Sequence, residues 1–370
     1  MSNLKVLVVD DTVTYRRILA EVVNSIAGAE VMATANNGKI ALAKIRQDRP
    51  DVVLLDMVMP EMDGLETLRH IKKDYPEIGV IMVSGSTAPQ AAETLKALEL
   101  GALDFISKPE GADPLVNFQE LKDGVRPLLT LFLTRRHISR ATEGLGHPAV
   151  AVKTAAKPAP PSPEVAHRPQ SLPTGIRVLV IGVSTGGPNA LAEVIPRLPA
   201  GFRVPVLIVQ HMPPSFTASL AGHLGRKSPL PVKEAKEGDH VCPGQVLIAP
   251  GGRHMTVKAV PGGAGSAGRI VVALNDFPPV NSCRPSVDVL FRSIAECYGG
   301  GSLAVIMTGM GEDGARGVRD LKDKGCYCLA QNEETCTVYG MPRAVVEARL
   351  ADEVLPLDQI ALRIMKIVGG

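Results

Sequence analysis

The residues best suited to chemistry lie in a glycine-rich stretch that contains Ser184. An apolar run over 178–181 precedes Gly182-Val183-Ser184-Thr185-Gly186-Gly187, and Pro188 follows where a helix is expected to begin. A strand that ends in a glycine-rich turn and opens a helix exposes one side chain beside a row of free backbone N–H groups. This geometry would make Ser184 a nucleophile with an anion-binding site next to it.

A nucleotide-phosphate loop is the alternative interpretation of the same stretch. Gly182 and Gly187 have the spacing of a P-loop, but Pro188 stands where such a loop requires Lys, and no G-x-G-x-x-G pattern falls within the stretch. The motif therefore favours a serine nucleophile, which in turn requires a base and a carboxylate elsewhere in the chain.

Composition excludes several classes of protein. A chain of 370 residues is too long for one ordinary core and predicts two domains. A formal net charge of +2 and 3% aromatic residues give no basis for binding nucleic acid. No apolar run approaches the roughly 18 residues of a membrane span, and the N-terminus lacks the apolar core of a signal peptide, so we expect no membrane insertion. The six cysteines include no Cys-x-x-Cys pair and indicate reduced thiols in a cytoplasmic protein.

The first part of the chain alternates short apolar runs with helical patterns. Continuous apolar strands separated by helices predict a parallel sheet that is covered on both faces. Ligands of such sheets bind beyond the carboxyl ends of the strands. The expected strands are 6–9, 31–35, 52–55, 80–83 and 104–107, and the expected helices are 14–24, 39–46, 64–74 and 89–100.

Polar residues with a shared chemistry follow these strands. Asp10 and Asp11 end the first strand, Asp56 the third and Ser84 the fourth, and Lys108 follows the fifth. Three clustered carboxylates repel one another unless a hard divalent cation joins them, and oxygen ligands suit Mg²⁺. The lysine and the serine hydroxyl could contact a phosphoryl group. For any one aspartate, capping of the next helix is the alternative, but it does not account for the whole set.

This set of residues resembles that of a two-component receiver domain, which implies a flavodoxin-like fold for about the first 125 residues. Asp10-Asp11, Asp56 followed by Met59-Pro60, Ser84 and Lys108-Pro109 match that family position by position. The resemblance implies that Asp56 accepts a phosphoryl group from a histidine kinase. It also implies that Asp11, Asp56 and the Val58 carbonyl hold Mg²⁺, with Asp10 helping through water. Ser84 and Phe105 occupy the family's switch positions.

The middle of the chain changes in composition. A leucine-rich helical tail is expected from Leu115 to about Ile138, and prolines accumulate from Gly144 to Thr174 among Ala, Val and Lys. Such a segment cannot bury a core, so we expect an extended, semi-stiff linker; a basic docking strip is the alternative. The predicted organisation is a receiver over 1–125, tail and linker over 126–174, and a second domain over 175–370.

The second domain repeats the alternation of strands and helices. Strands are expected at 178–181, 205–210, 302–308 and 326–331, and helices at 188–193, 215–224, 284–298 and 342–349, with a further helix that ends over 321–325. Ser215 is expected to cap the second of these helices. Runs at 245–252, 255–260 and 269–274 predict a β-meander. The domain is therefore predicted to be a mainly parallel α/β sheet with an antiparallel excursion.

Ser184, His211 and Asp313 each follow a predicted strand of this domain. They can converge at one edge of the sheet as nucleophile, base and orienting carboxylate. Their order along the chain differs from that of α/β-hydrolases. Backbone N–H groups of Gly309-Met310-Gly311 could complete an oxyanion site. Asp276 and Asp288 are competing carboxylates, and Asp288 is expected to serve a helix start.

The second domain resembles the catalytic domain of the chemotaxis protein-glutamate methylesterase family. The resemblance implies that Ser184 is the nucleophile, His211 the general base and Asp313 its partner, with the Met310 N–H as oxyanion donor and Thr185 in support. Cys283 departs from the family pattern, which commonly has His there. The stretches that carry the resemblance are 182–187, 210–214, 249–254, 284–288, 308–314 and 338–342.

Together the two resemblances imply a response-regulator methylesterase. Such an enzyme hydrolyses γ-glutamyl methyl esters on chemoreceptor cytoplasmic helices, releases methanol, and deamidates certain glutamines by the same acyl chemistry. It uses Mg²⁺ for receiver phosphorylation and no cofactor for the esterase reaction. Its site should be an open groove, covered by the receiver before phosphorylation. A non-catalytic docking module and an esterase or amidase with a substrate outside chemotaxis are the alternatives.

Overall fold

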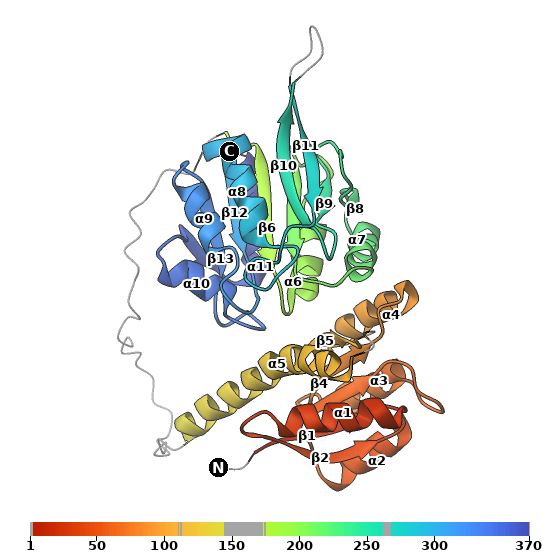
Figure 1. The fold of residues 1–370 in the computed structure, drawn as a ribbon. Helices are drawn as coiled ribbons and strands as arrows, with labels where there is room; N and C mark the ends of the chain where they lie inside the picture. Colours follow the sequence, from red (N-terminus) through yellow and green to blue (C-terminus); the bar gives the residue numbers. More distant parts are fainter. Residues whose placement is uncertain are drawn as a thin grey trace, which may run out of the picture.

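The computed structural model places the strands of the chain in two parallel sheets, one in each half of the chain, and adds a separate antiparallel hairpin (Figure 1). It describes residues 3–109, 111, 113–143, 173, 175–261 and 268–369, with side chains left undescribed over 135–143. The linker expected over 144–174 falls outside these residues except at Pro173. None of the helices in these ranges combines the length and apolar character that crossing a bilayer requires.

The first sheet has the parallel strand order β2-β1-β3-β4-β5, which is the flavodoxin-like order. Buried residues of α1 and α5 cover one face and those of α2, α3 and α4 the other. The strands are β1 (Leu4–Val9), β2 (Ala29–Ala35), β3 (Val52–Asp56), β4 (Gly79–Ser84) and β5 (Asp104–Ser107). The helices are α1 (Val13–Asn24), α2 (Gly38–Gln47), α3 (Gly64–Asp74), α4 (Ala88–Glu99) and α5 (Pro114–Glu143).

Local sequence explains where these elements begin. The strands are continuous apolar runs because both faces of the sheet are buried. Asn37 and Asp63 start α2 and α3 by accepting hydrogen bonds from the backbone N–H groups of Ile40 and Glu66. The helix α5 extends five residues past the predicted end at Ile138, because no glycine or proline follows until Gly144 to stop it.

The second sheet has the strand order β14-β13-β12-β6-β7-β9-β8, with β6 in its centre. Its buried apolar side chains pack against α6, α7 and α11 on one face and against α8, α9 and α10 on the other. The strands are β6 (Val178–Val183), β7 (Val206–Gln210), β8 (Val232–Glu234), β9 (Val246–Ile248), β12 (Ser302–Ile306), β13 (Tyr327–Gln331) and β14 (Glu353–Leu355). The helices are α6 (Gly187–Val194), α7 (Phe216–Lys227), α8 (Val287–Tyr298), α9 (Ala315–Lys322), α10 (Met341–Glu347) and α11 (Leu357–Gly369), with 3-10 turns η1 (Ile195–Arg197) and η2 (Gly299–Gly301).

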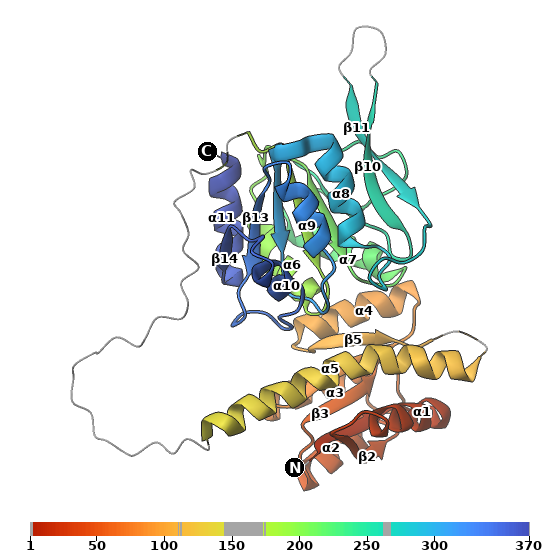
Figure 2. The same ribbon diagram turned by 60° about the vertical axis from the view of Figure 1, so that its left-hand side comes forward.

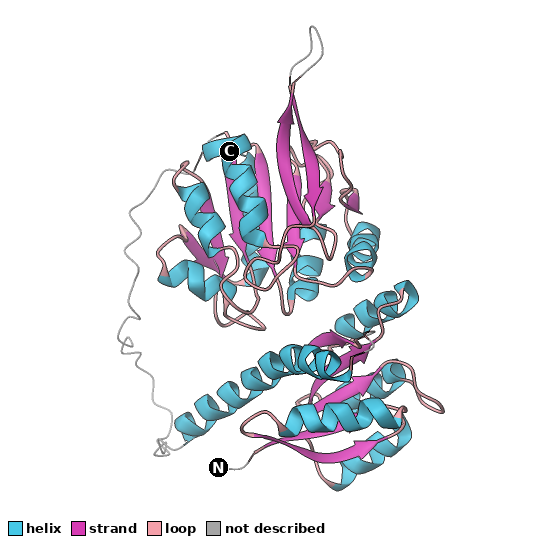
Figure 3. Cartoon of the chain, in the orientation of Figure 1, coloured by secondary structure: helices cyan, strands magenta, loops and turns pink. Residues whose placement is uncertain are grey.

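The predicted β-meander is wrong in one strand. β9 pairs in parallel with β7 and β8 and so belongs to the main sheet. Only β10 (His254–Val260) and β11 (Arg269–Asn275) are antiparallel, and they form a hairpin that projects from the domain on the side away from the receiver (Figures 2 and 3). Short apolar runs do not reveal the direction of their partners, which explains the error.

Ser215 does not cap α7 as predicted. Its φ is 71° and its side chain makes no capping hydrogen bond. Three further elements, β8, β14 and α11, were not predicted. The two strands among them are three residues long and lie at the two edges of the sheet. Their residues are only partly buried, and three residues are too few to show the apolar periodicity of a strand.

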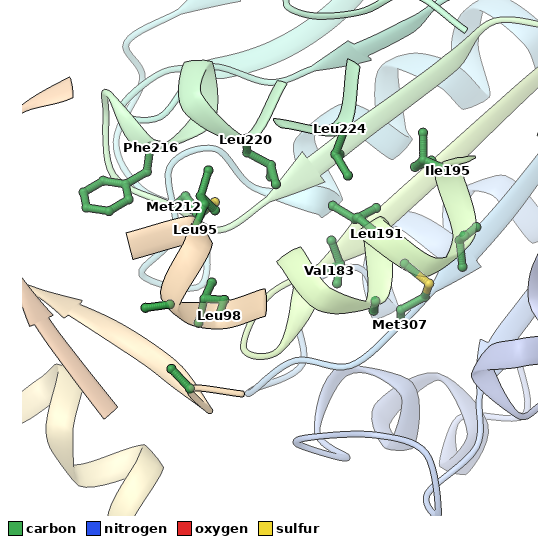
Figure 4. Packing of buried hydrophobic residues seen from close by; sticks show 14 of the residues in the cluster. Leu95, Leu98, Val183, Leu191, Ile195, Met212, Phe216, Leu220, Leu224 and Met307 are labelled. Atoms are coloured by element: carbon green, nitrogen blue, oxygen red, sulfur yellow. The ribbon is translucent and has the colours of Figure 1, made fainter. Parts of the chain in front are cut away.

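The two halves of the chain share one apolar cluster. Helix α4 of the first half lies against α6 and α7 of the second, and Leu95 and Leu98 pack among residues such as Met212 and Leu220 (Figure 4). The Phe105 ring stacks on that of Phe216 with centroids 4.4 Å apart. The receiver therefore contacts the same face of the second domain that carries α6, the helix after Ser184.

Candidate active site

Ser184, His211 and Asp313 follow three neighbouring strands. Ser184 comes directly after β6, His211 directly after β7, and Asp313 lies in the loop after β12, and these strands are adjacent in the order β12-β6-β7. In the sheet, β7 lies on one side of β6 and β12 lies on the other. The loops that follow β6 and its two neighbours therefore lead in different directions, which is where α/β sheets leave a crevice for a ligand. The topology alone therefore places the loops that carry the three residues side by side.

Close backbone packing fixes the Ser184 loop. The Ser184 N–H donates to the Thr308 carbonyl, and the Gln210 side-chain amide donates to the Ser184 carbonyl at 2.9 Å. A Cβ at Gly309 would lie 2.8 Å from the Ser184 Cβ, so only glycine lets the β12 loop approach this closely. Gly186 has a φ of 74°, which starts α6 by a left-handed turn.

His211 and Asp313 form a buried pair. The His211 Nε2 lies 2.8 Å from the Asp313 Oδ2, which leaves Nδ1 as the ring nitrogen that can accept a proton. Burial by itself would lower the pKa of His211, but hydrogen bonds to Asp313 and Cys283 raise it to about 9. Burial would raise the pKa of Asp313, but the hydrogen bond and charge of His211 bring it to about 2. The pair is thus arranged as carboxylate and imidazolium.

Asp313 accepts several hydrogen bonds besides that from His211. The Asn281 amide and the Ser286 hydroxyl donate to its Oδ1 at 2.8 Å each, and the Val287 N–H donates to Oδ2 at 2.6 Å. These donors keep the carboxylate ionised and hold it in one rotamer. Sequence reasoning missed Asn281 and Ser286, because only the fold brings that loop against the carboxylate.

The two competing carboxylates have other partners. Asp288 accepts from the N–H groups of Gly314 and Gly317 at the start of α9, and from the Asn281 amide. It therefore serves a helix start, as expected, although the helix is α9 and not its own. Asp276 is paired at 3.0 Å with Arg253 in an exposed position. Neither carboxylate contacts His211.

Cys283 lies on the proton-accepting side of His211. Its Sγ is 3.5 Å from the Nδ1. The Ser184 hydroxyl makes no hydrogen bond to any residue in the described part of the chain. The structure thus joins His211 to Asp313 and to Cys283, and leaves the hydroxyl of Ser184, the predicted nucleophile, without a partner in the described part of the chain. Apo sites with loose nucleophile–base contacts are common, because the contact tightens when substrate binds.

The neighbouring loops offer donors and open space. The Met310 side chain is 41% exposed, and the N–H of Met310 makes no hydrogen bond within the described ranges, so it is free to meet an oxyanion. Beside His211 the surface is hollowed and open to solvent. The lining residues of this hollow include Met212, Pro213, Cys283 and Arg284. An open hollow suits a side chain presented by another protein better than a small metabolite.

A second polar cluster lies at the carboxyl edge of the receiver sheet. Ligand oxygens of Asp10, Asp11 and Asp56 lie within 4.8 Å of one another, which fits a hard cation such as Mg²⁺. The Lys108 Nζ lies 2.8 Å from Asp10 and 2.9 Å from Asp56. Burial raises the pKa of Asp56 to about 6, although Lys108 opposes this rise. The cluster thus combines three carboxylates that could hold a cation with the positive charge of Lys108.

The predicted switch residues lie between this cluster and the second domain. Ser84 is buried and accepts a hydrogen bond at 2.9 Å from the Thr94 hydroxyl of α4. Phe105 faces outward from β5 and stacks on Phe216. Ser84 and Phe105 could therefore transmit a rearrangement at the acidic cluster to the contact between the two halves.

Comparisons with known proteins decide the family. The family model described as CheB methylesterase matches residues 179–364, more than half of the chain, and the response regulator receiver domain model matches residues 6–119. The chain belongs to the CheB methylesterase family. Receiver domains use Mg²⁺ for phosphorylation, and a receiver together with this catalytic domain makes a response-regulator enzyme.

Similar proteins match over their whole length. A protein-glutamate methylesterase/protein-glutamine glutaminase of Desulfotalea psychrophila is 45% identical, with 100% of this chain and 99% of that protein aligned. One of Trichodesmium erythraeum is 39% identical over 100% of both chains. The crystal structure of the Thermotoga maritima CheB methylesterase catalytic domain is 43% identical, covers 52% of this chain and 98% of its own, and has a TM-score of 0.49.

Replacing Cys283 by Ala should change the pH dependence of hydrolysis by the unphosphorylated full chain. A general base must be unprotonated, so activity should rise with pH up to about 9, the value to which Asp313 and Cys283 raise the pKa of His211. Without the sulfur the pKa falls, and the rise in kcat/KM should move to lower pH. The measurement is the pH profile of methanol release.

Cys242, which is exposed and free, supplies the matched control. Cys242→Ala should leave the profile in place. If Cys283→Ala also leaves it in place, the sulfur has no influence on the base.

Proposed function

We propose that this protein is a phosphorylation-activated protein-glutamate methylesterase that also deamidates glutamines, and that Ser184, His211 and Asp313 carry out both reactions. The single observation behind this proposal is the buried His211–Asp313 pair, placed on the strand ends that flank Ser184. The substrate is a methylated glutamate on a chemoreceptor cytoplasmic helix. The names of the matched relatives, which describe both activities, support this assignment.

The first half of the reaction forms an acyl-enzyme. Ser184 Oγ attacks the side-chain carbonyl carbon while His211 Nδ1 takes the hydroxyl proton, and the Met310 N–H receives the developing oxyanion. His211 then returns the proton to the leaving oxygen, and methanol departs. Asp313 holds the ring by its Nε2–H and stabilises its charged form.

The second half repeats the chemistry with water. A water molecule gives a proton to His211 Nδ1 and attacks the acyl carbon, and the proton then returns to Ser184 Oγ as the carboxylic acid of glutamate leaves and loses its own proton to solvent. With a glutamine substrate the same steps release ammonia in place of methanol. Thr185 supports the nucleophile loop, since its carbonyl accepts a hydrogen bond at 2.9 Å from the Thr308 hydroxyl.

The receiver supplies regulation. Asp56 accepts a phosphoryl group from a histidine kinase, and Asp11, Asp56 and the Val58 carbonyl would hold the Mg²⁺ that this step needs, with help from Asp10. The acidic cluster and the bridging Lys108 support this assignment. Mg²⁺ would neutralise charge between the carboxylates and the incoming phosphoryl group. Such a pathway operates in the cytoplasm.

The docked receiver restrains the enzyme from the side of α6 and α7, because the hollow beside His211 stays open to solvent while the receiver is bound. Helix α4 and strand β5 lie on the face that carries α6 and α7, which borders the Ser184 loop (Figure 4). Phosphorylation can activate the enzyme only if the phosphorylated receiver binds this face less well. Phe105 connects the two events, because one ring serves both as switch and as part of the contact with Phe216.

Removing the nucleophile should abolish both activities. Ser184→Ala should lower methanol release from methylated receptor by about 10⁴-fold or more, because the acyl-enzyme cannot form. Asp313→Asn should be severe but milder, since it disturbs the tautomer and charge of His211 without removing the base. Ser219→Ala, on helix α7, is the control for loss of a serine hydroxyl. Turnover near normal in a folded Ser184→Ala variant would place the nucleophile elsewhere.

Phosphorylation of the receiver should depend on Asp56 and on Mg²⁺. A small phosphodonor should label the wild-type chain, and neither Asp56→Asn nor a metal-chelated sample should be labelled, because the acidic cluster repels a phosphoryl anion unless a cation is bound. Asp48→Asn removes an exposed carboxylate and should be labelled normally. Persistent labelling of Asp56→Asn would assign the acceptor to another residue.

Charge reversal across the domain contact should weaken the restraint by the receiver. Glu99 on α4 is paired with Lys227 and His223 on α7, so Glu99→Lys and Lys227→Glu should each raise the activity of the unphosphorylated chain by about two- to fivefold. The double exchange should restore inhibition. All forms should be equally active after phosphorylation. Unchanged activity in both single variants, measured on the same receptor, would mean that this contact does not restrain the enzyme.

A further inference from the structure

A cysteine and a histidine face each other in the hollow of the candidate active site. The Cys283 Sγ lies 3.5 Å from the His211 Nδ1, and both residues line this hollow, which is open to solvent. Thiolate sulfur and imidazole nitrogen are ligands that Zn²⁺ prefers in proteins. An ion from solvent therefore has direct access to two atoms that suit it.

The distance between these two atoms fits one shared metal ion. Zn²⁺ binds sulfur at about 2.3 Å and nitrogen at about 2.0–2.1 Å, with tetrahedral angles between its ligands. A sulfur and a nitrogen on the same ion are therefore about 3.5 Å apart, which is the separation between Cys283 Sγ and His211 Nδ1. The two side chains could share an ion in the positions that they already hold, with water in the remaining coordination positions.

Asp313 supports the histidine from the other side of the ring. Ligand atoms of Asp313, His211 and Cys283 lie within 4.8 Å of one another. The oxygens of Asp313 already accept hydrogen bonds from the Ser286 hydroxyl and the Val287 N–H, besides that from His211 Nε2. Metal-binding histidines usually donate their second ring N–H to a carboxylate in this way, which fixes the ring and makes it a stronger ligand. Asp313 therefore orients the ring, and Nδ1 is left to bind an ion.

The two candidate metal sites among the described residues differ in ligand chemistry. The acidic cluster of the receiver offers carboxylate oxygens, which suit Mg²⁺. The pair of Cys283 and His211 offers sulfur and nitrogen, which favour Zn²⁺ over Mg²⁺. The Mg²⁺ that the receiver needs would therefore not compete for the second site.

We propose that His211 and Cys283 form a binding site for Zn²⁺, and that an ion held there blocks the catalytic base. The ion would occupy the lone pair of Nδ1, which must take the hydroxyl proton of Ser184 during acylation. It would act as an inhibitor of hydrolysis and not as a cofactor. The blocking effect rests on the proposed function, whereas the binding of the ion does not.

Cobalt binding tests the site without measuring activity. Co²⁺ takes the place of Zn²⁺ in such sites and gives an intense charge-transfer band in the near ultraviolet when a thiolate binds it. The reduced full chain, freed of thiols and chelators, is titrated with Co²⁺ in excess Mg²⁺, which occupies the carboxylate cluster of the receiver. The wild-type chain should develop the band, and Zn²⁺ should abolish it. A wild-type chain without the band would overturn the site.

Variants assign the two ligands. Cys283→Ser should abolish the band, and His211→Gln should raise the Kd for Co²⁺ about 100-fold or more, because loss of an outer partner alone costs about 10–100-fold. Cys242→Ala and Cys297→Ala are the matched controls and should keep the band. Circular dichroism verifies that each variant is folded. A band that persists in Cys283→Ser, or an unchanged Kd in folded His211→Gln, would overturn the assignment.

Inhibition gives a second measurement, made on the unphosphorylated full chain. Zn²⁺ should lower methanol release by the wild type, and a chelator should restore it. Cys283→Ser, compared with its own rate without Zn²⁺, should need at least about tenfold more Zn²⁺ for half inhibition. Equal sensitivity of the two proteins would overturn the block of the base. A chain that binds Co²⁺ through Cys283 but releases no methanol even without Zn²⁺ would contradict the proposed function and leave the metal site standing.

Discussion

The geometry of the candidate site depends on the hydrogen bonds of the buried Asp313 carboxylate. It joins three segments that are far apart in the chain: the loop after β12, the His211 loop after β7, and the residues that lead into α8. A carboxylate with this many donors stays ionised although it is buried. It fixes the ring of His211 and at the same time ties down the Asn281 loop that carries Cys283 beside that ring. Removing one donor would therefore disturb position as well as charge.

The parts of the structure that follow from local patterns could be predicted. Continuous apolar runs identified the main strands of both sheets, and helices followed because each run ended in glycine, proline or a capping residue. Parallel strands bring their carboxyl ends to one edge, so the positions of Ser184, His211 and Asp313 after predicted strands were enough to place them at the same edge of the sheet, although the adjacency of the three strands was not predicted. The acidic cluster of the receiver followed from the same argument.

The parts that depend on partners distant in sequence could not be predicted. Phe105 lies in a short strand and carries no local sign that its ring meets that of Phe216 across the domain contact. Asn281 and Ser286 lie in a loop whose direction is set by Asp313. β9 has the same apolar pattern whether its partner runs parallel or antiparallel, and only the neighbouring β7 decides. In each case the prediction required knowing which surfaces pack against each other, and the periodicity of a sequence does not give this information.

The Phe105–Phe216 stack has a consequence for the receiver itself. If an inward turn of the Phe105 ring accompanies phosphorylation, docking holds the receiver in the arrangement that binds a phosphoryl group less well. Thermodynamic reciprocity requires the two effects to be equal. If the phosphoryl group makes the free energy of docking less favourable by a given amount, docking makes the binding of the phosphoryl group less favourable by the same amount. The catalytic domain is then a regulator of its own regulator. Any protein surface that competes with α4 for α7 would sensitise Asp56 to its phosphodonor without touching it.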